Sequence, residues 1–317
     1  MKTFILSFFL ALHTSTVLVS AAAASSRERR ITARVILTSS GRVNEYDVGQ
    51  SPNVMKMYDI SYSGCYGVNP CSLREKTPMA SIQADPDGSD SDKVMRVKYE
   101  AGLSASDSGM QFYTTQLRDE FTEKEMNGEG TLEYKVYFPS NFDWVKGGKL
   151  PGLYGGDSKT CSANRKANGD NCFSARLMWR EGGKGETYFY LPFGMQKDSL
   201  CSKCTWPEMS ECTGSTDHCS YQRGKNDFKF RKGSWNSIKQ YIRMNTPGEK
   251  DGLYRLSLNG KVVHEISSVY YRSTYDLSLG GLYFSTFFGG NGGSYAPDND
   301  MYAYFKDMRL SVGDVDA

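Results

Sequence analysis

Histidine is nearly absent from this chain, and its scarcity excludes several classes of catalytic site. The 317 residues include 3 histidines, and only His218 and His264 lie beyond an N-terminal segment that has the features of a signal peptide. Neither has metal-ligand spacing. A Ser-His-Asp triad would need one of them, but the chain has no Gly-x-Ser-x-Gly elbow and no phosphate-binding glycine motif. We therefore interpret both histidines as structural.

Long apolar runs and an excess of one charge are also missing. Residues 1–24 have the order of a secretory signal peptide, with Lys2, the apolar stretch Phe4–Leu12 and small residues up to Ala24. Loss of Lys2 with this segment reduces the 38 basic residues to 37, against 36 acidic ones. This balance argues against nucleic acids and membranes as partners. We expect a secreted, extracellular monomer.

Linkers and internal repeats are absent as well, which favours a single domain. The predicted organisation is a signal peptide over residues 1–24, a variable segment over residues 25–50 and one domain over residues 51–317. The charged segment Arg27–Arg30 is either a dibasic processing site or a solvated tail.

Glycine and aromatic residues are abundant, and this composition is typical of strands joined by turns. The chain has 32 glycines and 13% aromatic residues. Period-two alternation predicts strands over residues 132–138, 174–180, 188–191, 238–245, 254–259, 281–288 and 301–312. Only short helices are expected, for example near Thr115–Glu120. The pattern predicts an all-β, single-domain β-sandwich or jelly roll with a groove on one concave sheet.

All eight cysteines follow the signal peptide, and an even number in an exported chain predicts disulfides. The expected local pairs are Cys65–Cys71 and Cys161–Cys172. The remaining four allow three connectivities among which the sequence does not choose: Cys201, Cys204, Cys212 and Cys219. The alternative for these four is a zinc site, because two of them have two-residue spacing. Secretion argues against zinc, so no metal is expected.

The segment Phe142–Gly156 carries two lysines around a Gly-Gly pair, followed by Pro-Gly. Glycines permit bends that other residues resist. We expect a turn here that directs Lys149 toward a ligand, with Lys146 close by.

A second candidate set lies on two neighbouring predicted strands. Ser174 and Arg176 share one strand face, and Tyr188 and Tyr190 share the next, with a hairpin predicted through residues 182–185. If both faces point into one groove, these four side chains converge. The alternative is an exposed strand pair with ordinary polar residues.

A glycoside hydrolase is a competing interpretation of a β-sandwich. It would need two carboxylates that face each other across a groove. The candidates are Glu133, Glu181 and Glu186, which form no recognisable paired motif.

Several motifs together resemble polysaccharide lyase family 14. They are Gln111–Thr114, the Lys-Gly-Gly-Lys-Leu-Pro-Gly-Leu run that contains Lys149, the Cys-Phe-Ser-x-Arg-x-Met-Trp-Arg run, and the Tyr-x-Tyr pair. The resemblance continues through Trp235–Ile238, Asn245–Gly248 and Phe284–Gly290. It spans residues 95–312 in order. The chain departs from the family pattern in its loop Asp157–Asn171 and in its insertion Cys201–Cys219.

The resemblance implies a jelly roll that cleaves an anionic polyuronate, either alginate or glucuronan, by β-elimination without a cofactor. The motif lysine falls on Lys149, the family's Ser-x-Arg on Ser174 and Arg176, and its Tyr-x-Tyr on Tyr188 and Tyr190. Elimination needs a neutralised carboxylate, a base and an acid.

Arg176 and Ser174 suit the carboxylate. We favour Lys149 as base and Tyr188 or Tyr190 as acid, although these roles can be exchanged. Tyr113 is a candidate for stacking on a sugar ring, whereas Trp144 is expected in the core. The alternative function is a non-catalytic carbohydrate-binding jelly roll.

Overall fold

The computed structural model describes residues 80–88, 93–113, 128–156, 161–162, 165–222, 228–289 and 293–312. It also describes three short strands: β1 (Thr32–Arg34), β2 (Ile36–Leu37) and β3 (Tyr46–Asp47). Several predictions lie outside the described residues, namely the signal peptide, the charged segment Arg27–Arg30, the Cys65–Cys71 pair and the short helix near Thr115–Glu120.

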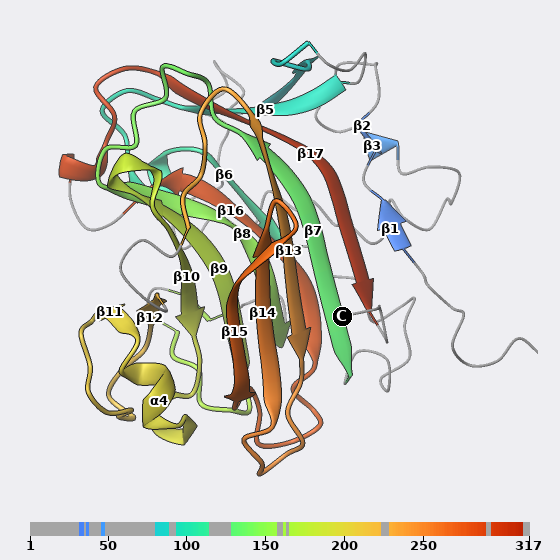
Figure 1. Ribbon diagram of the computed structural model, residues 1–317, viewed down its shortest axis with the longest axis vertical. Coiled ribbons are helices and arrows are strands. Elements are labelled where there is room, and N and C mark those ends of the chain that lie inside the picture. Colours follow the sequence, from blue (N-terminus) through green and yellow to red (C-terminus); the bar gives the residue numbers. More distant parts are fainter. Residues whose placement is uncertain are drawn as a thin grey trace, which may run out of the picture.

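Two large antiparallel sheets form the fold (Figure 1). The eight-stranded sheet has the order β15 (Lys261–Val269), β14 (Gly252–Leu258), β13 (Trp235–Arg243), β7 (Glu129–Tyr137), β17 (Met301–Val312), β5 (Lys93–Tyr99) and β4 (Ala80–Ala84), with β1 paired to β17. The seven-stranded sheet has the order β11 (Cys204–Trp206), β12 (Cys219–Tyr221), β10 (Gly185–Tyr190), β9 (Cys172–Arg180), β8 (Gly147–Gly156), β16 (Leu279–Phe288) and β6 (Met110–Tyr113).

This architecture confirms the predicted all-β sandwich of the jelly-roll type. Helical segments are short in the described chain, and the α-helix there is the four-residue α4 (Asp198–Cys201). No described helix has the length and apolar character needed to cross a membrane.

The hydrophobic core lies between the two sheets because each sheet turns its apolar alternate residues inward. On β7, Leu132, Tyr134 and Val136 face this core, as the alternation predicted. Aromatic rings pack edge to face at one end, where Trp179 contacts Tyr99, Phe142 and Phe288 at centroid distances of 5.9, 5.7 and 5.3 Å. Trp144 belongs to the same core, also as predicted.

The prediction of a turn after Lys149 is wrong. Residues Gly147–Gly156 form the ten-residue strand β8, which is buried along its whole length in the middle of the seven-stranded sheet. Pro151 is tolerated there because the register to β9 shifts between Leu150 and Leu153, so that Pro151 and Gly152 lie opposite the single residue Arg176. Such a β-bulge is where a strand can accept proline, which has no N–H to donate.

Three disulfides hold the loops at one end of the seven-stranded sheet. Cys161 pairs with Cys172 as predicted, and the open connectivity resolves into Cys201–Cys212 and Cys204–Cys219. None of the described cysteines is free. The four residues considered for zinc are therefore joined as disulfides and offer no thiolate.

Candidate active site

The outward face of the seven-stranded sheet brings together the side chains that the sequence singled out. The antiparallel register of β9 and β10 places Arg176 opposite Tyr188 and Ser174 opposite Tyr190. On the other side of β9, β8 places Lys149 opposite Met178. Because side chains alternate along a strand, these residues all point away from the core, and the predicted pairing of the two strand faces is confirmed.

Lys149 is enclosed by neighbouring side chains, and 7% of its surface is exposed. Its Nζ donates a hydrogen bond to Met178 Sδ over 2.7 Å and lies 2.8 Å from the centroid of the Tyr188 ring. A flexible side chain is thus held in one place, in contact with one of the two candidate tyrosines.

Burial is the main cause that lowers the pKa of Lys149 well below its ordinary value of 10.5. The positive charges of Arg176 and Arg180 lower this pKa further, whereas Glu186 opposes them. A lysine in such surroundings loses its proton more easily and can accept another from a substrate.

Arg176 is almost fully enclosed, with 3% of its surface exposed. It donates from Nη1 to Ser285 Oγ over 3.1 Å, and its guanidinium carbon lies 4.6 Å from the centroid of the Tyr283 ring. The Tyr190 ring centroid is 5.8 Å away. Its planar fork is therefore fixed between strands, the arrangement that suits recognition of a carboxylate.

The hydroxyl of Ser174 has an internal partner. It donates a hydrogen bond of 2.7 Å to the carbonyl oxygen of Cys161, and the residue has no exposed surface. Ser174 therefore ties the disulfide loop between Cys161 and Cys172 to the sheet. In that loop, Ala167 packs against the small cluster that contains Tyr188 and Tyr190.

Tyr188 and Tyr190 are buried next to each other, with ring centroids 5.7 Å apart. Burial first, and then the neighbouring phenol of Tyr190, raises the pKa of Tyr188 above its ordinary value of 10.0, against a lowering effect of Arg176. The phenol consequently keeps its proton, whereas Lys149 tends to lose its own. Environments that move two pKa values in opposite directions are a means of separating acid and base roles.

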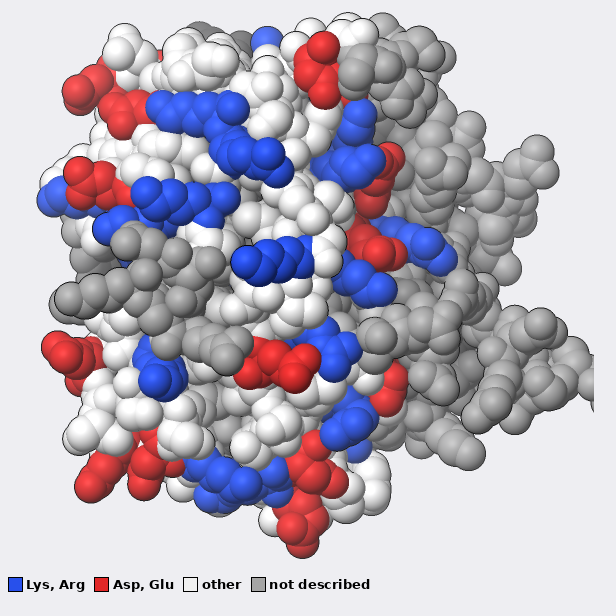
Figure 2. All heavy atoms as spheres, in the orientation of Figure 1, with Lys and Arg blue, Asp and Glu red and all other residues white. Residues whose placement is uncertain are grey.

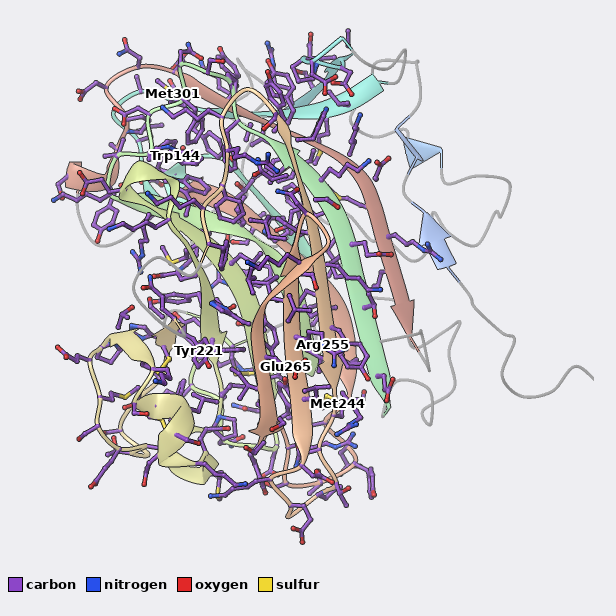
Figure 3. The ribbon with its side chains drawn as sticks, in the orientation of Figure 1. Trp144, Tyr221, Met244, Arg255, Glu265 and Met301 are labelled. Carbon is purple, nitrogen blue, oxygen red and sulfur yellow. A yellow bond between two sulfur atoms is a disulfide. The ribbon has the colours of Figure 1, made fainter. Side chains whose placement is uncertain are left out.

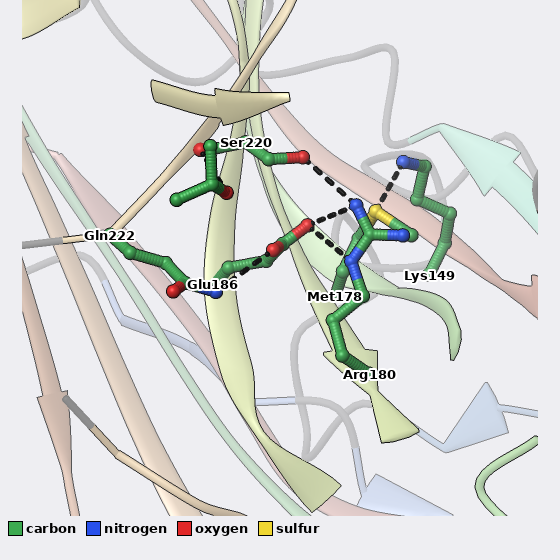
Figure 4. Close-up of polar contacts among 7 residues, drawn as sticks. Lys149, Met178, Arg180, Glu186, Ser220 and Gln222 are labelled. Atoms are coloured by element: carbon green, nitrogen blue, oxygen red, sulfur yellow. Dashed lines mark hydrogen bonds and ion pairs between the residues drawn. The ribbon is translucent and has the colours of Figure 1, made fainter. Parts of the chain in front are cut away.

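Arg180 and Glu186 extend the polar face, and the sequence did not assign either of them to the site. The carboxylate of Glu186 accepts from Arg180 Nε over 2.8 Å and from Gln222 Nε2 over 3.2 Å (Figure 4). Arg180 also donates to Ser220 Oγ over 2.9 Å. The strand pattern did place Arg180 on the face of Arg176, but nothing in it showed that Glu186 would be its partner.

His218 was interpreted as structural, yet it lies against both tyrosines. Its ring is nearly parallel to that of Tyr188 at a centroid distance of 5.3 Å and lies 5.8 Å from that of Tyr190. The carboxylate of Asp217 shares a hydrogen bond with Nδ1 of His218. His218 immediately precedes β12, which pairs with β10; no strand was predicted over residues 217–221, although alternation there would have placed this histidine on the face of Ser220.

Two further candidates are not brought into this cluster by the described contacts. Lys146 is exposed before β8, and its Nζ lies 5.7 Å from the centroid of the Tyr295 ring. Tyr113 lies on β6 with its backbone opposite Tyr283, and its side chain is outside the described part of the structure. Gln111 on the same strand does reach the site, where its Oε1 accepts from Tyr283 and Ser285.

The candidate carboxylates of a glycoside hydrolase are spread over different elements, and Glu181 lies exposed in the turn Glu181–Gly183 before β10. Glu133 lies on β7 of the eight-stranded sheet, where it pairs with Arg309, whereas Glu186 lies on β10 of the other sheet, bonded to Arg180. Within the described residues, no cluster of three or more His, Cys, Asp or Glu side chains suited to a metal ion occurs. The site is instead cationic and phenolic.

Comparison with known proteins points to one family. The family model of polysaccharide lyase 14 matches residues 87–308. The solved structure of the marine PL-14 alginate lyase from Aplysia kurodai superposes with a TM-score of 0.61 at 31% identity, and the match covers 74% of this chain and 87% of that one.

Two viral relatives share parts of the chain. The alginate lyase vAL-1 from Chlorella virus has the same fold, with a TM-score of 0.57 and 22% identity over 74% of this chain and 89% of its own. The protein named exolysin from Paramecium bursaria Chlorella virus 1 is 27% identical over 205 residues, which are 59% of this chain. The chain spans 30% of the length of that curated relative. Because the family model covers more than half of the sequence, including every strand of the candidate site from β8 to β16, the chain belongs to the polysaccharide lyase 14 family.

Proposed function

We propose that this lyase is secreted and cleaves a 1,4-linked polyuronate, with alginate as the leading substrate, by β-elimination. The observation that carries the proposal is the contact of buried Lys149 with Tyr188 on the same sheet face as Arg176. The alginate assignment is supported by the enzyme from Aplysia kurodai, the relative at 31% identity. The same fold holds alginate trisaccharide in a variant of the alginate lyase Aly36B, at 20% identity and a TM-score of 0.54.

Neutralisation of the uronate carboxylate is the first requirement, because it makes the C5 proton more acidic. Arg176 is the proposed partner, since its guanidinium is permanently charged and presents a planar fork. Its contacts with Ser285 and the Tyr283 ring fix that fork before substrate arrives. Preorganised charge of this kind stabilises the negative charge that develops as the C5 proton leaves.

Lys149 is the proposed base. Its neutral amine takes the C5 proton, the C5–H electrons form the C4–C5 double bond, and the C4–O4 bond breaks. The lowered pKa of Lys149 supports this role, because a larger fraction of the amine is unprotonated near neutral pH.

A phenol of the tyrosine pair is the proposed acid that protonates the departing O4. Tyr188 keeps its proton because burial and Tyr190 raise its pKa. Tyr190, whose hydrogen bond with Tyr188 also raises the Tyr188 pKa, offers a path by which the spent donor regains a proton. The products are a saturated end and an unsaturated uronide end, and no cofactor takes part.

The disulfides in the loops support secretion. Three disulfides in a single chain fit an oxidising compartment. Expression of residues 1–317 in a eukaryotic host, followed by N-terminal sequencing of protein from the medium, tests this; retention in the cells with an intact N-terminus would contradict it.

Substrate identity is tested with a panel of polymannuronate, polyguluronate and glucuronan. Cleavage by elimination creates a conjugated double bond that absorbs in the ultraviolet, so a rise in absorbance distinguishes it from hydrolysis. We expect the rise with at least one alginate block. Reducing ends formed without the absorbance would refute elimination, and activity on glucuronan alone would refute alginate as the substrate.

A further inference from the structure

A buried amide crosses from the eight-stranded sheet to the bulge beside Arg176. Gln240 lies on the inward face of β13 with 1% of its surface exposed. Its Oε1 accepts a hydrogen bond of 2.6 Å from the backbone N–H of Leu153 on β8. Its Nε2 donates over 2.6 Å to the carbonyl oxygen of Ala175 on β9. One side chain therefore joins two adjacent strands of the seven-stranded sheet.

The position of this amide is specific. Leu153 and Ala175 are opposite each other and form the first pair after the bulge in β8. At the same bulge, the hydroxyl of Tyr134 on β7 donates to the carbonyl oxygen of Pro151 over 3.0 Å. A Cβ at Gly152 would lie 2.0 Å from the Ala175 carbonyl oxygen, so the two strands approach closely there. Gln240 and Tyr134 of the eight-stranded sheet thus form hydrogen bonds to the backbone of the seven-stranded sheet at its bulge.

The network continues to the strand that carries the tyrosines. Gln240 Nε2 also donates to the hydroxyl of Tyr254 over 2.9 Å, and that hydroxyl shares a hydrogen bond of 3.1 Å with Thr187 on β10. Two members of the network lie next to site residues in the sequence: Ala175 precedes Arg176, and Thr187 precedes Tyr188. Because neighbouring residues in a strand point to opposite faces, the network contacts the inward side of the strands whose outward side forms the site.

We propose that Gln240 is a positioning residue of this lyase, whose amide fixes β8 against β9 at the bulge and thereby sets the placement of Lys149 relative to Arg176. Tyr134 supports the same bulge through Pro151. The inference rests on the proposed roles of Lys149 and Arg176. It adds to them a role for two core residues, Gln240 and Tyr134, neither of which would contact the substrate.

The test compares Gln240→Leu with Ile242→Ala. Both residues are buried on the inward face of β13, but none of the contacts described for Ile242 involves the bulge. We expect Gln240→Leu to lose about 10²-fold in kcat/KM toward the polyuronate that the wild type cleaves, which is the cost of a misplacement of about 1 Å. Ile242→Ala should lower the melting temperature yet keep turnover per folded molecule. Equal activity of the two variants at matched folded fraction would overturn the inference.

A second readout does not depend on turnover. The pKa of Lys149, followed by NMR of protein with isotope-labelled lysine side chains and with Lys149→Arg as the assignment control, should rise in Gln240→Leu and stay unchanged in Ile242→Ala. It rises because Lys149 loses burial and proximity to Arg176 when the strands separate. If the wild type cleaves no polyuronate, the proposed function fails, while this titration still decides the role of Gln240.

Tyr134→Phe covers the case in which Gln240→Leu does not fold. It removes one hydroxyl and keeps the ring in the core. We expect a smaller loss in kcat/KM, about three- to tenfold, with an upward shift of the Lys149 pKa. No change in either quantity would overturn the role of the bulge contacts.

Discussion

The outward faces of the two sheets follow the same alternation but differ in how their charges are grouped: charges on the eight-stranded sheet form pairs of opposite sign, including the largely buried pair of Lys306 and Asp85, whereas the seven-stranded sheet buries two basic residues next to each other. On the eight-stranded sheet, Arg255 and Glu265 form an ion pair of 2.6 Å with side chains 26% and 47% exposed (Figure 3). The side of the molecule turned to the viewer in Figure 2 shows basic and acidic residues interspersed. On the seven-stranded sheet, Lys149 and Arg176 are buried at 7% and 3% exposure.

The difference separates solvated charges from those to which we assign a catalytic role. An exposed pair such as Arg255–Glu265 contributes about 0–1 kcal/mol and needs no further role. Burial of a charged group costs stability unless partners compensate it, and here two cations lie close enough for Arg176 to lower the pKa of Lys149. A fold does not gain stability from two buried basic groups that lower each other's affinity for protons, and such perturbed groups are concentrated at functional sites. The following substitutions test this contrast.

Replacement of Lys149 should have the largest effect. Lys149→Ala removes the proposed base, and we expect about a 10³-fold or greater loss of kcat with the fold intact. Lys149→Arg keeps the charge, but a guanidinium hardly deprotonates, so it should bind oligouronate and fail to form the unsaturated end. Absorbance assays and calorimetric binding measure the two properties.

The matched control is Lys135→Ala, on the eight-stranded sheet. Lys135 pairs with Asp307 over 2.8 Å at 40% and 38% side-chain exposure, so its loss should leave kcat unchanged. Substantial turnover in Lys149→Arg would remove Lys149 from the base role and transfer it to Tyr188 or Tyr190.

Replacement of Arg176 should have the next largest effect. Arg176→Ala removes the charge that stabilises the enolate-like intermediate, and we expect a loss of about 10²–10³ in kcat/KM. Arg176→Lys should recover part of it, because the charge returns without the planar fork. The control Arg255→Ala should stay within twofold of the wild type. An equal loss of kcat/KM in Arg176→Ala and Arg255→Ala would contradict the contrast between the two sheets.

The sequence predicted the strands whose outward residues are polar, and it predicted which candidates share a face. On β7 and β13 the alternation is visible because one face meets water. It fails on β8, where all ten residues are buried and the glycines and Pro151 resemble turn signals. Only the two flanking strands show that Pro151 lies in a bulge, and that information is not local in the sequence.

Contacts across the sheets were beyond prediction for the same reason. Gln240 occupies an inward position like its neighbours Ile238 and Ile242, and nothing local shows that its amide reaches the backbone of Leu153 and Ala175. The pairing of the last four cysteines was also undetermined, since three connectivities satisfy the spacing. His218 was set aside because a lone histidine carries no motif, yet its strand register brings it to Tyr188.

Glu186→Gln tests the electrostatic balance around Lys149, with a smaller effect. Glu186 raises the pKa of Lys149, so removal of its charge lowers that pKa further. Activity requires the neutral amine and falls as the pH drops through its pKa. The acid limb of the kcat/KM profile should therefore move to lower pH, by less than about one pH unit because the opposing effects of burial, Arg176 and Arg180 are larger.

Glu265→Gln is the control for Glu186→Gln, because it removes an exposed carboxylate from the other sheet. We expect its pH profile to match the wild type. A shift of the acid limb to higher pH in Glu186→Gln would contradict Lys149 as the base, since the sign of the shift follows directly from the charge that is removed.

Loss of the His218 ring should have the smallest effect. A contact between aromatic rings contributes about 0.5–1.5 kcal/mol, which corresponds to a two- to tenfold change. We expect His218→Asn to reduce kcat/KM within that range because Tyr188 and Tyr190 lose a packing partner, and His218→Phe to restore most of it. The control is Tyr304→Asn on the eight-stranded sheet, where Tyr304 contacts Tyr137 at 6.0 Å. If His218→Phe is as impaired as His218→Asn, the imidazole nitrogens held by Asp217, rather than the packing of a ring, are what the site requires.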